Sequence, residues 1–271
     1  MPAGSPPGGL PERARALAGG ALAVAPARDA ATVALLRDAA GGVEVYLLRR
    51  VRAMSFAAGM HVFPGGAVDP ADAEPGGGWT GPPPSAFAAS LGCGEPLALA
   101  LVRAAVREVF EESGVLLAGP SADAVIDDVS TDDWEAERAS LEAREQTLPE
   151  LLARRGLLLR ADLLRPWAHW ITPEVEPKRF DTRFFVARVP EGQVCREAGG
   201  EADQRLWVRP QEAVDRALRM MPPTAAVLAD LAAAPDVAAV LATPRTIQPV
   251  LPELVLGEDD RIGFRLPGEP A

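Results

Sequence analysis

The sequence predicts an α/β (α+β) fold, and three observations lead to that class. Two runs of apolar and β-branched residues, 32–38 and 43–50, flank a short glycine turn and indicate a strand hairpin. Residues 96–113 carry apolar side chains at helical spacing, which indicates a long amphipathic helix. Strand-like and helix-like segments then alternate, so a sheet and helices are expected to pack together in one domain.

The composition fits one large domain with a substantial core. The chain has 271 residues, of which 48% are hydrophobic and 24% are charged. Its net charge of −11 argues against nucleic acid as a partner, because sequence-independent binding needs a basic surface. The same charge argues against an anionic membrane surface. No window of 18 uncharged apolar residues occurs, so no membrane-spanning helix is expected.

The N-terminal region and the cysteines bear on location. Residues 1–30 are rich in Ala, Gly and Pro and are predicted to be a flexible lead-in, without the pattern of a signal peptide. Cys93 and Cys195 form neither a metal-type spacing nor a disulfide framework. These features predict a cytoplasmic protein.

Strand-like sequence comes first along the chain, and a glycine- and proline-rich stretch follows it. "TVALLRD" and "VEVYLLRR" are joined by "AAGG", and "MHVFPGG" adds a third short strand that ends at Gly65 and Gly66. Residues 70–96 are then dominated by glycine and proline, which predicts a loop.

The helix after this stretch has both of its ends marked. Pro96 suits the first helical turn, and Gly114 suits the position just past the last one. One side of the helical wheel is mostly apolar, with Leu99, Val102, Val106, Val109, Phe110 and Ser113. "VLLA" (115–118) follows as a predicted buried strand.

The second half of the chain continues the alternation. Residues 130–155 are predicted to be helical, with Ser130 or Thr131 as the N-cap. "WAHWITP" and "RFDTRFFVARV" are predicted strands, "RLWVRPQEAVDRALRM" a strand, a turn and a helix, and "TAAVLADLAAA" a further helix. Residues 244–271 form a proline-rich tail, for which the sequence predicts no structure.

Three glutamates on the long helix carry the clearest chemical signal. In "REVFEESG", Glu108, Glu111 and Glu112 share an arc of roughly 100° opposite the apolar stripe. Like charges at this spacing repel by a few tenths of a kcal/mol per pair, and a divalent cation would turn that repulsion into attraction. The alternative is that they are simply the solvated face of an amphipathic helix.

The string around these glutamates resembles the Nudix box, whose pattern is G-x5-E-x7-R-E-U-x-E-E-x-G-U with U an aliphatic residue. Gly66 matches the leading glycine, and the second half is matched by Arg107, Glu108, Val109, Glu111, Glu112, Gly114 and Val115. Asp72 stands where the pattern has its first glutamate. The spacer from Ala73 to Val106 has 34 residues where the pattern has seven. Residues 70–96 therefore resemble an insertion inside the box, which the slow growth of loop-closure entropy tolerates.

A split box of this kind resembles the coenzyme A diphosphatases related to the peroxisomal Nudix enzyme of animals. "FAAGMHVFPGGAVDPAD", "WITP" and "RFDTRFF" fit that branch, and the resemblance runs from about Thr32 to about Leu231. It implies a Nudix fold, a mixed β-sheet sandwiched between α-helices. The domain would span residues 31–243, with insertions at about 70–96 and 119–165, before the tail at 244–271.

The resemblance also implies roles for the box residues. Glu111 and Glu112 would bind Mg²⁺ or Mn²⁺, and Glu108 would be a further ligand or the general base. The backbone carbonyl of Gly65 is a candidate fourth ligand. Arg107 would orient the glutamates through an ion pair, or would simply be a surface arginine paired with Glu111.

Further candidates lie outside the box. Glu201 and Asp203 are candidates for an additional acid. Coenzyme A carries a 3′-phosphate, which guanidinium groups bind well. The candidates for that contact are Arg49, Arg50, Arg52, Lys178, Arg179 and Arg183, although scattered solubilising cations are an equal alternative.

The resemblance implies a pyrophosphohydrolase that cleaves coenzyme A or an acyl derivative to 3′,5′-ADP and a phosphopantetheine. The alternatives are hydrolysis of ADP-ribose, NADH or dinucleoside polyphosphates, and a Nudix domain that only binds nucleotides as a sensor. The expected partner is a small nucleotide, and a homodimer stays open. His61 and His169 receive no role, and a zinc site is not expected.

Overall fold

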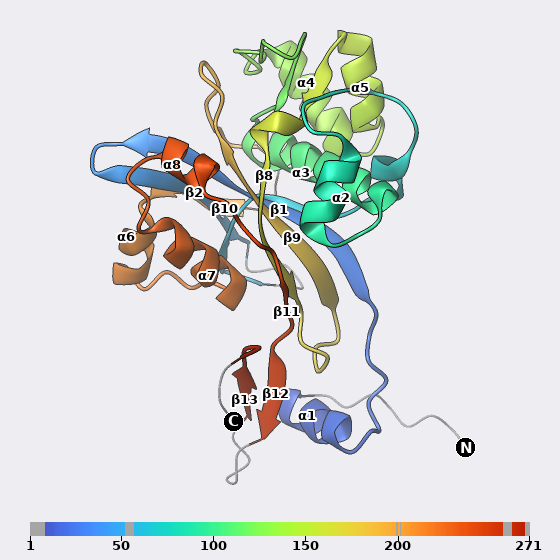
Figure 1. Cartoon of the computed structure of the whole chain (residues 1–271), viewed down its shortest axis with the longest axis vertical. Helices are drawn as coiled ribbons and strands as arrows, with labels where there is room; N and C mark the ends of the chain where they lie inside the picture. Colours follow the sequence, from blue (N-terminus) through green and yellow to red (C-terminus); the bar gives the residue numbers. More distant parts are fainter. Residues whose placement is uncertain (1–8, 52–56, 199, 201, 257–261, 269–271) are drawn as a thin grey trace.

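One mixed β-sheet with helices on both faces forms the body of the molecule (Figure 1). The computed structural model describes residues 9–51, 57–198, 200, 202–256 and 262–268. Strand order in the sheet is β10-β2-β1-β9-β8-β11, with β3 paired to β2 and β4 paired to β1. The predicted fold class is therefore confirmed.

The main sheet has eight strands: β1 (Ala27–Ala39), β2 (Gly42–Arg50), β3 (His61–Val62), β4 (Gly65–Ala67), β8 (Arg165–Ile171), β9 (Arg179–Arg188), β10 (Ala202–Val208) and β11 (Pro249–Val250). A three-stranded sheet contains β5 (Gly78–Thr80), β6 (Ala118–Gly119) and β7 (Leu158–Arg160), and a hairpin contains β12 (Glu253–Leu256) and β13 (Ile262–Arg265). The helices are α1 (Leu10–Ala18), α2 (Pro84–Leu91), α3 (Glu95–Ser113), α4 (Asp132–Glu142), α5 (Leu148–Arg155), α6 (Pro210–Asp215), α7 (Pro222–Leu231) and α8 (Val237–Ala242), with 3-10 turns η1 (Pro70–Ala73) and η2 (Ala161–Leu163).

The centre of the sheet is apolar on both faces, because helices cover both. In β1, Val33 and Leu35 belong to the core that contains α3, whereas Ala34 and Leu36 belong to the core that contains α7 and α8. This is why the strand reads as a continuous apolar run. Strand β1 pairs in parallel with β9, and on its other side pairs antiparallel with β2 and β4.

Helix α3 is the central helix of one face, and the glycines at its ends fix its length. Gly94 is the N-cap, and Gly114 ends the helix in the left-handed region at φ 70°. A side chain at Gly114 would also collide with Arg196, whose Nη1 would lie 2.4 Å from the added Cβ. The helix starts one residue before the predicted Pro96 and ends where predicted.

The prediction of a loop at 70–96 was wrong. The segment contains η1, β5 and α2, and the apolar residues Trp79, Phe87 and Leu91 pack into the α3 core. Pro84 stands at the first turn of α2, where the missing N–H costs nothing. The predicted strand at 115–118 is a buried segment of which only Ala118 belongs to a strand.

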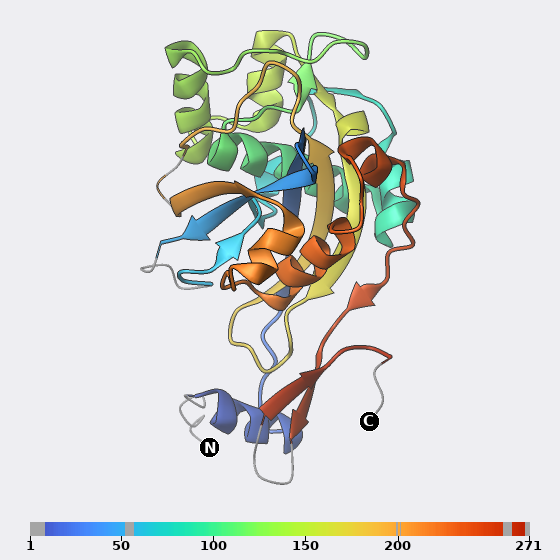
Figure 2. The same ribbon diagram turned by 90° about the vertical axis from the view of Figure 1, so that its left-hand side faces the viewer.

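The two terminal predictions also need correction. Of the predicted flexible lead-in, Leu10–Ala18 is a helix and β1 already begins at Ala27. The tail adds β11 to the main sheet and forms the β12–β13 hairpin beside α1, below the body of the molecule (Figure 2). Arg13 Nε ties α1 to the β8–β9 loop by donating to the carbonyl of Val175 at 2.7 Å.

The described helices include no single one that is long and apolar enough to cross a membrane. Among the described helices, α2 and α3 taken together are long and apolar enough, but the two are bent by 96° relative to each other.

Helices α4 and α5 lie within the predicted insertion at 119–165 and are joined by a charged network around Glu137. Its carboxylate, 8% exposed, accepts hydrogen bonds from Arg154, Arg155 and Gln146. Chiefly the hydrogen bond from Arg154 lowers the pKa of Glu137 to about 2. The network fixes the turn between the two helices.

Replacing Glu137 with Gln is expected to lower the free energy of unfolding by roughly 1.5–3 kcal/mol at pH 7. The native pKa lies below the unfolded value of 4.5, so the charge contributes fully above pH 4.5. That contribution disappears as the pH falls toward about 2. Urea denaturation at pH 7, 4 and 3 should therefore show that the difference in free energy of unfolding between wild type and Glu137→Gln becomes smaller as the pH falls.

Glu142→Gln is the control. It removes a partner of Arg138 at a 39% exposed position and should lower the free energy of unfolding by less. A difference between wild type and Glu137→Gln that does not change with pH would contradict this assignment.

Candidate active site

The three box glutamates lie on the side of α3 away from its apolar stripe, as predicted. Glu108 and Glu111 line a cavity of about 310 Å³ together with Arg107. The opposite walls come from the η1 turn and from the turn between α4 and α5. These walls contain Asp69, Ala71, Asp72, Leu141, Glu142, Arg144, Gln146, Thr147 and Leu148.

Arg107 is the hub of this carboxylate cluster. Its side chain is 13% exposed and donates to both oxygens of Asp72 at 3.0 Å. It also donates to Glu108 at 2.7 Å, to Glu111 at 3.2 Å and to the carbonyl of Ala67 at 3.1 Å. It is therefore a buried, fully used guanidinium and not a surface arginine with one partner.

Asp72 reaches Arg107 despite the 34 residues between Ala73 and Val106. A capping box holds it, in which Ala71 donates to Asp69 at 3.0 Å and Asp69 donates back to Asp72 at 2.9 Å. Arg103, one turn before Arg107 on α3, donates to the Asp72 carbonyl and to two further carbonyls of the same segment. The first half of the split box is thus bound to the helix that carries the second half.

The glycine pair brings strand β4 against the glutamates. The amide of Gly65 donates to Glu112 Oε2 at 2.8 Å. Gly66 lies so near Glu108 that an added Cβ would be 2.4 Å from Oε1. A side chain at this position would displace the carboxylate.

The cluster is electrostatically crowded. Burial and the charge of Glu108 raise the pKa of Glu111 to about 7, although Arg107 acts in the opposite direction. Burial pulls the pKa of Arg107 down, but its hydrogen bond to Asp72 and the charges of Glu108 and Glu111 raise it above the ordinary value. The site therefore holds more negative charge than one arginine neutralises.

A divalent cation fits this donor set chemically. Carboxylate oxygens in a partly buried cavity are the ligands that Mg²⁺ and Mn²⁺ prefer. As the side chains stand, no group of three His, Cys, Asp or Glu converges to hold a metal anywhere in the described residues. Arg107 bridges Glu108 and Glu111, and Glu112 is drawn to Gly65, so binding a cation requires these side chains to turn toward it.

The basic residues predicted for phosphate binding lie elsewhere. Of those that the structure describes, none lines the cavity. Arg49, on β2, forms an ion pair at 2.7 Å with Asp203, on β10, which is one of the two candidates for an additional acid. Arg50 ends β2. Arg52 and Glu201 lie outside the described residues.

Three more of these residues have contacts of their own. Arg179 donates to the carbonyls of Thr172 and Ala25 at 2.9 and 2.8 Å. The buried Arg183 pairs with Asp29 and Asp181. Lys178 lies 5.5 Å from the centre of the Phe180 ring. Arg179 and Arg183 thus make structural contacts here, and their contact with a phosphate stays a prediction.

The histidines stay outside the cavity as well. His169 Nε2 contacts Asp181 Oδ1 at 2.5 Å. His61 is buried in β3, and burial lowers the pKa of its ring.

Sequence reasoning missed the rest of the cavity wall. The capping-box pattern of Asp69 and Asp72 in "DPAD" was a readable signal. Arg144 and Gln146 had no such signal, because their place depends on how α4 and α5 fold back over α3.

Comparison with known proteins identifies the family. A family profile described as the NUDT19 Nudix domain matches residues 84–225, more than half of the chain. The chain belongs to this Nudix family. A crystal structure of a NUDIX hydrolase from Alicyclobacillus acidocaldarius shares 32% sequence identity with a TM-score of 0.69. That match covers 83% of this chain and 99% of the other.

Two curated relatives of this Nudix domain are named acyl-coenzyme A diphosphatase NUDT19. The protein from Gallus gallus is 28% identical over 242 residues, covering 70% of this chain and 62% of its own length. The protein from Xenopus laevis is 27% identical over 205 residues, covering 64% and 54% respectively. The chain thus spans less than two thirds of the length of these relatives.

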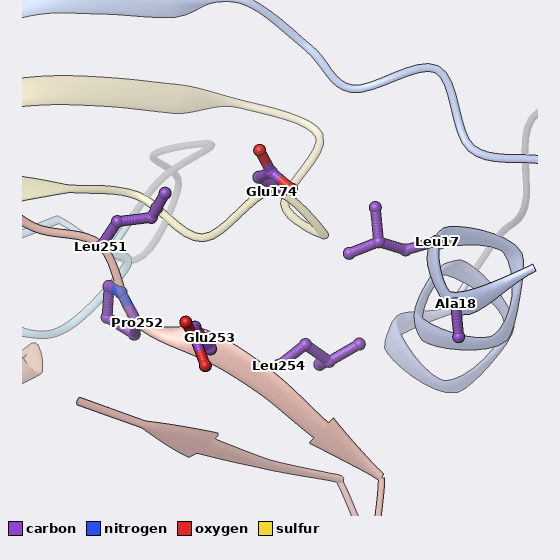
Figure 3. Close-up of a pocket in the computed structure, with 7 residues that line it drawn as sticks. All are labelled: Leu17, Ala18, Glu174, Leu251, Pro252, Glu253 and Leu254. Carbon is purple, nitrogen blue, oxygen red and sulfur yellow. The ribbon is translucent and has the colours of Figure 1, made fainter. Parts of the chain in front are cut away.

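A second cavity of about 400 Å³ lies between α1, the β8–β9 loop and β12 (Figure 3). Leu17, Leu251 and Leu254 give it apolar walls, and Glu174 and Glu253 are the charged residues among the described ones that line it. The box glutamates line the smaller cavity and not this one, so the chemistry of the box belongs to the smaller cavity.

Substituting the two glycines separately should distinguish the site from the fold. Gly66→Ala is expected to leave the melting temperature nearly unchanged, because the added Cβ meets a flexible carboxylate. It should nevertheless weaken Mn²⁺ binding about tenfold or more, since Glu108 is displaced. Gly65→Ala is the matched comparison, in which the Cβ meets the Ala31 carbonyl at 2.5 Å, and about 1–3 kcal/mol of stability should be lost. Thermal melts and Mn²⁺ titration followed by paramagnetic resonance measure both effects. Equal loss of stability in the two variants would refute this division.

Proposed function

We propose that the protein is a Mg²⁺- or Mn²⁺-dependent pyrophosphohydrolase that cleaves a nucleoside diphosphate linked to another group. The observation that carries the proposal is the buried cluster of Glu108, Glu111, Asp72 and Arg107 at the wall of one cavity. Such a cluster has the charge to bind a cation, and a cation in turn binds a diphosphate.

Each residue of the cluster has a task in this reaction. Glu111 and Glu112 bind the cation, with the carbonyl of Gly65 as a further ligand. Glu108 is either a third ligand or the base that takes a proton from the attacking water. Arg107 and Asp72 keep the carboxylates in place. A bound divalent cation supplies positive charge to the diphosphate and lowers the pKa of water.

We infer coenzyme A or an acyl-coenzyme A as the substrate, with 3′,5′-ADP and a phosphopantetheine as products. The names of the chicken and frog relatives support this choice, as does the split box. We further propose a cytoplasmic enzyme, because the chain has only two cysteines and both are free.

Product analysis by mass spectrometry tests the proposal. The protein is incubated with Mg²⁺ and a mixture of coenzyme A, ADP-ribose, NADH and diadenosine polyphosphates. Wild-type protein should release 3′,5′-ADP, and Glu111→Gln with Glu112→Gln should lower the rate at least about a hundredfold, because the cation loses two ligands. Glu142→Gln, at the cavity wall but outside the cluster, is the matched control.

The other products separate the alternatives. Release of AMP from another substrate would keep the reaction and reject coenzyme A. Nucleotide binding without turnover would reject catalysis and favour a sensor.

A further inference from the structure

The turn between α4 and α5 places one arginine, Arg144, at the edge of the cavity that the carboxylates line. Arg144 lines the cavity, and its side chain is 83% exposed. The other lining cation, Arg107, is 13% exposed and is occupied by four acceptors. Of the described lining residues, Arg144 alone has a guanidinium that faces solvent and can receive a new anion.

The only ion pair that the described residues give Arg144 is a long one. Asp69 Oδ2 lies 3.6 Å from Nη1, beyond hydrogen-bonding distance. Asp69 already accepts a hydrogen bond from Ala71 within the capping box. The exchange of this distant carboxylate for a phosphate oxygen would give Arg144 a shorter, charge-assisted pair.

The backbone of Arg144 is also unusual. Its φ is 58°, one of three positive values among the described non-glycine residues. It follows the last residues of α4, where glycine is the usual choice, because a Cβ is disfavoured in this conformation. Arginine at this position therefore carries a backbone cost that glycine would avoid.

The turn is held in place by its neighbours. The amides of Arg144 and Glu145 donate to the carbonyls of Leu141 and Ser140, each at 2.9 Å. Gln146 is bonded to Glu137, the centre of the α4–α5 network. The guanidinium is therefore carried on a fixed backbone, which reduces the entropy lost when it binds an anion.

We propose that Arg144 binds a phosphate group of the nucleotide substrate and so contributes to substrate specificity. The inference deepens the proposed function and rests on the same cavity. The phosphate has two sources, the diphosphate that is cleaved and a further phosphate on the ribose. The positive charge of Arg144 offsets the acidic walls, which would otherwise repel either group.

Two substitutions test the proposal without endangering the fold. Arg144→Gly and Arg144→Asn both remove the charge and suit the left-handed backbone. Ala217→Gly is the matched control, because Ala217 has a φ of 49° and follows α6, away from the cavity. Melting temperatures should stay unchanged or rise for all three variants.

The binding measurements use calorimetry with 3′,5′-ADP and AMP in the presence of Mg²⁺, together with KM for coenzyme A and dephospho-coenzyme A. Both Arg144 variants should raise Kd or KM about tenfold, and Ala217→Gly should leave them unchanged. Weakening confined to coenzyme A and 3′,5′-ADP identifies the ribose phosphate as the contact. Weakening for all four compounds identifies the phosphate of the diphosphate that is attached to the adenosine 5′ carbon. Weakening confined to coenzyme A and dephospho-coenzyme A identifies the other phosphate of the diphosphate.

The remaining outcomes separate this inference from the proposed function. Turnover and binding that are identical in wild type and both Arg144 variants overturn the inference and leave the function intact. Binding that depends on Arg144 in a protein without turnover keeps the inference and rejects the function. A wild-type protein that binds none of the nucleotides overturns the inference as well.

Discussion

The arrangement of the site depends on one buried arginine, Arg107. Arg107 lies among Asp72, Glu108 and Glu111, and each of these acids would be costly to bury without it. It also joins three pieces of chain, because Asp72 comes from η1, the Ala67 carbonyl from β4 and the glutamates from α3. One side chain thus sets both the charge balance and the meeting of these elements. The excess negative charge that remains is what makes a cation a suitable occupant.

The sheet explains why these elements meet at this place. Strand β4 is short and pairs only with the first half of β1, where Thr32 lies opposite Gly65. Helix α3 packs on the same face, through the core that includes Val33 and Leu35. Two glycines allow β4 and α3 to approach until Glu112 bonds the Gly65 amide and Glu108 lies against Gly66. Close backbone approach thus acts together with Arg107 in fixing the positions of the glutamates.

Local patterns in the sequence predicted the elements that form from residues close together in the chain. The strand pair β1–β2, helix α3 and the arc of glutamates follow from period and spacing, and the structure contains them. Strand β5 escaped prediction because its partner β7 lies some 80 residues later. The spacing from Gly66 marked Asp72, whereas Arg144 reaches the cavity only through the path of the whole chain, so spacing could not reveal it. The arginines predicted for phosphate binding had no spacing signal of their own, and those that the structure describes lie outside the cavity.

The three-stranded sheet β5-β7-β6 has a consequence for how the domain can vary. Strand β5 belongs to the segment that splits the box, whereas β6 and β7 belong to the segment that carries α4 and α5. The two predicted insertions therefore share backbone hydrogen bonds, and residues of both line the cavity. Shortening either would leave the other with an unpaired strand edge. Relatives of this chain should accordingly keep both insertions or lack both, and changes in length should fall in the loops outside this small sheet.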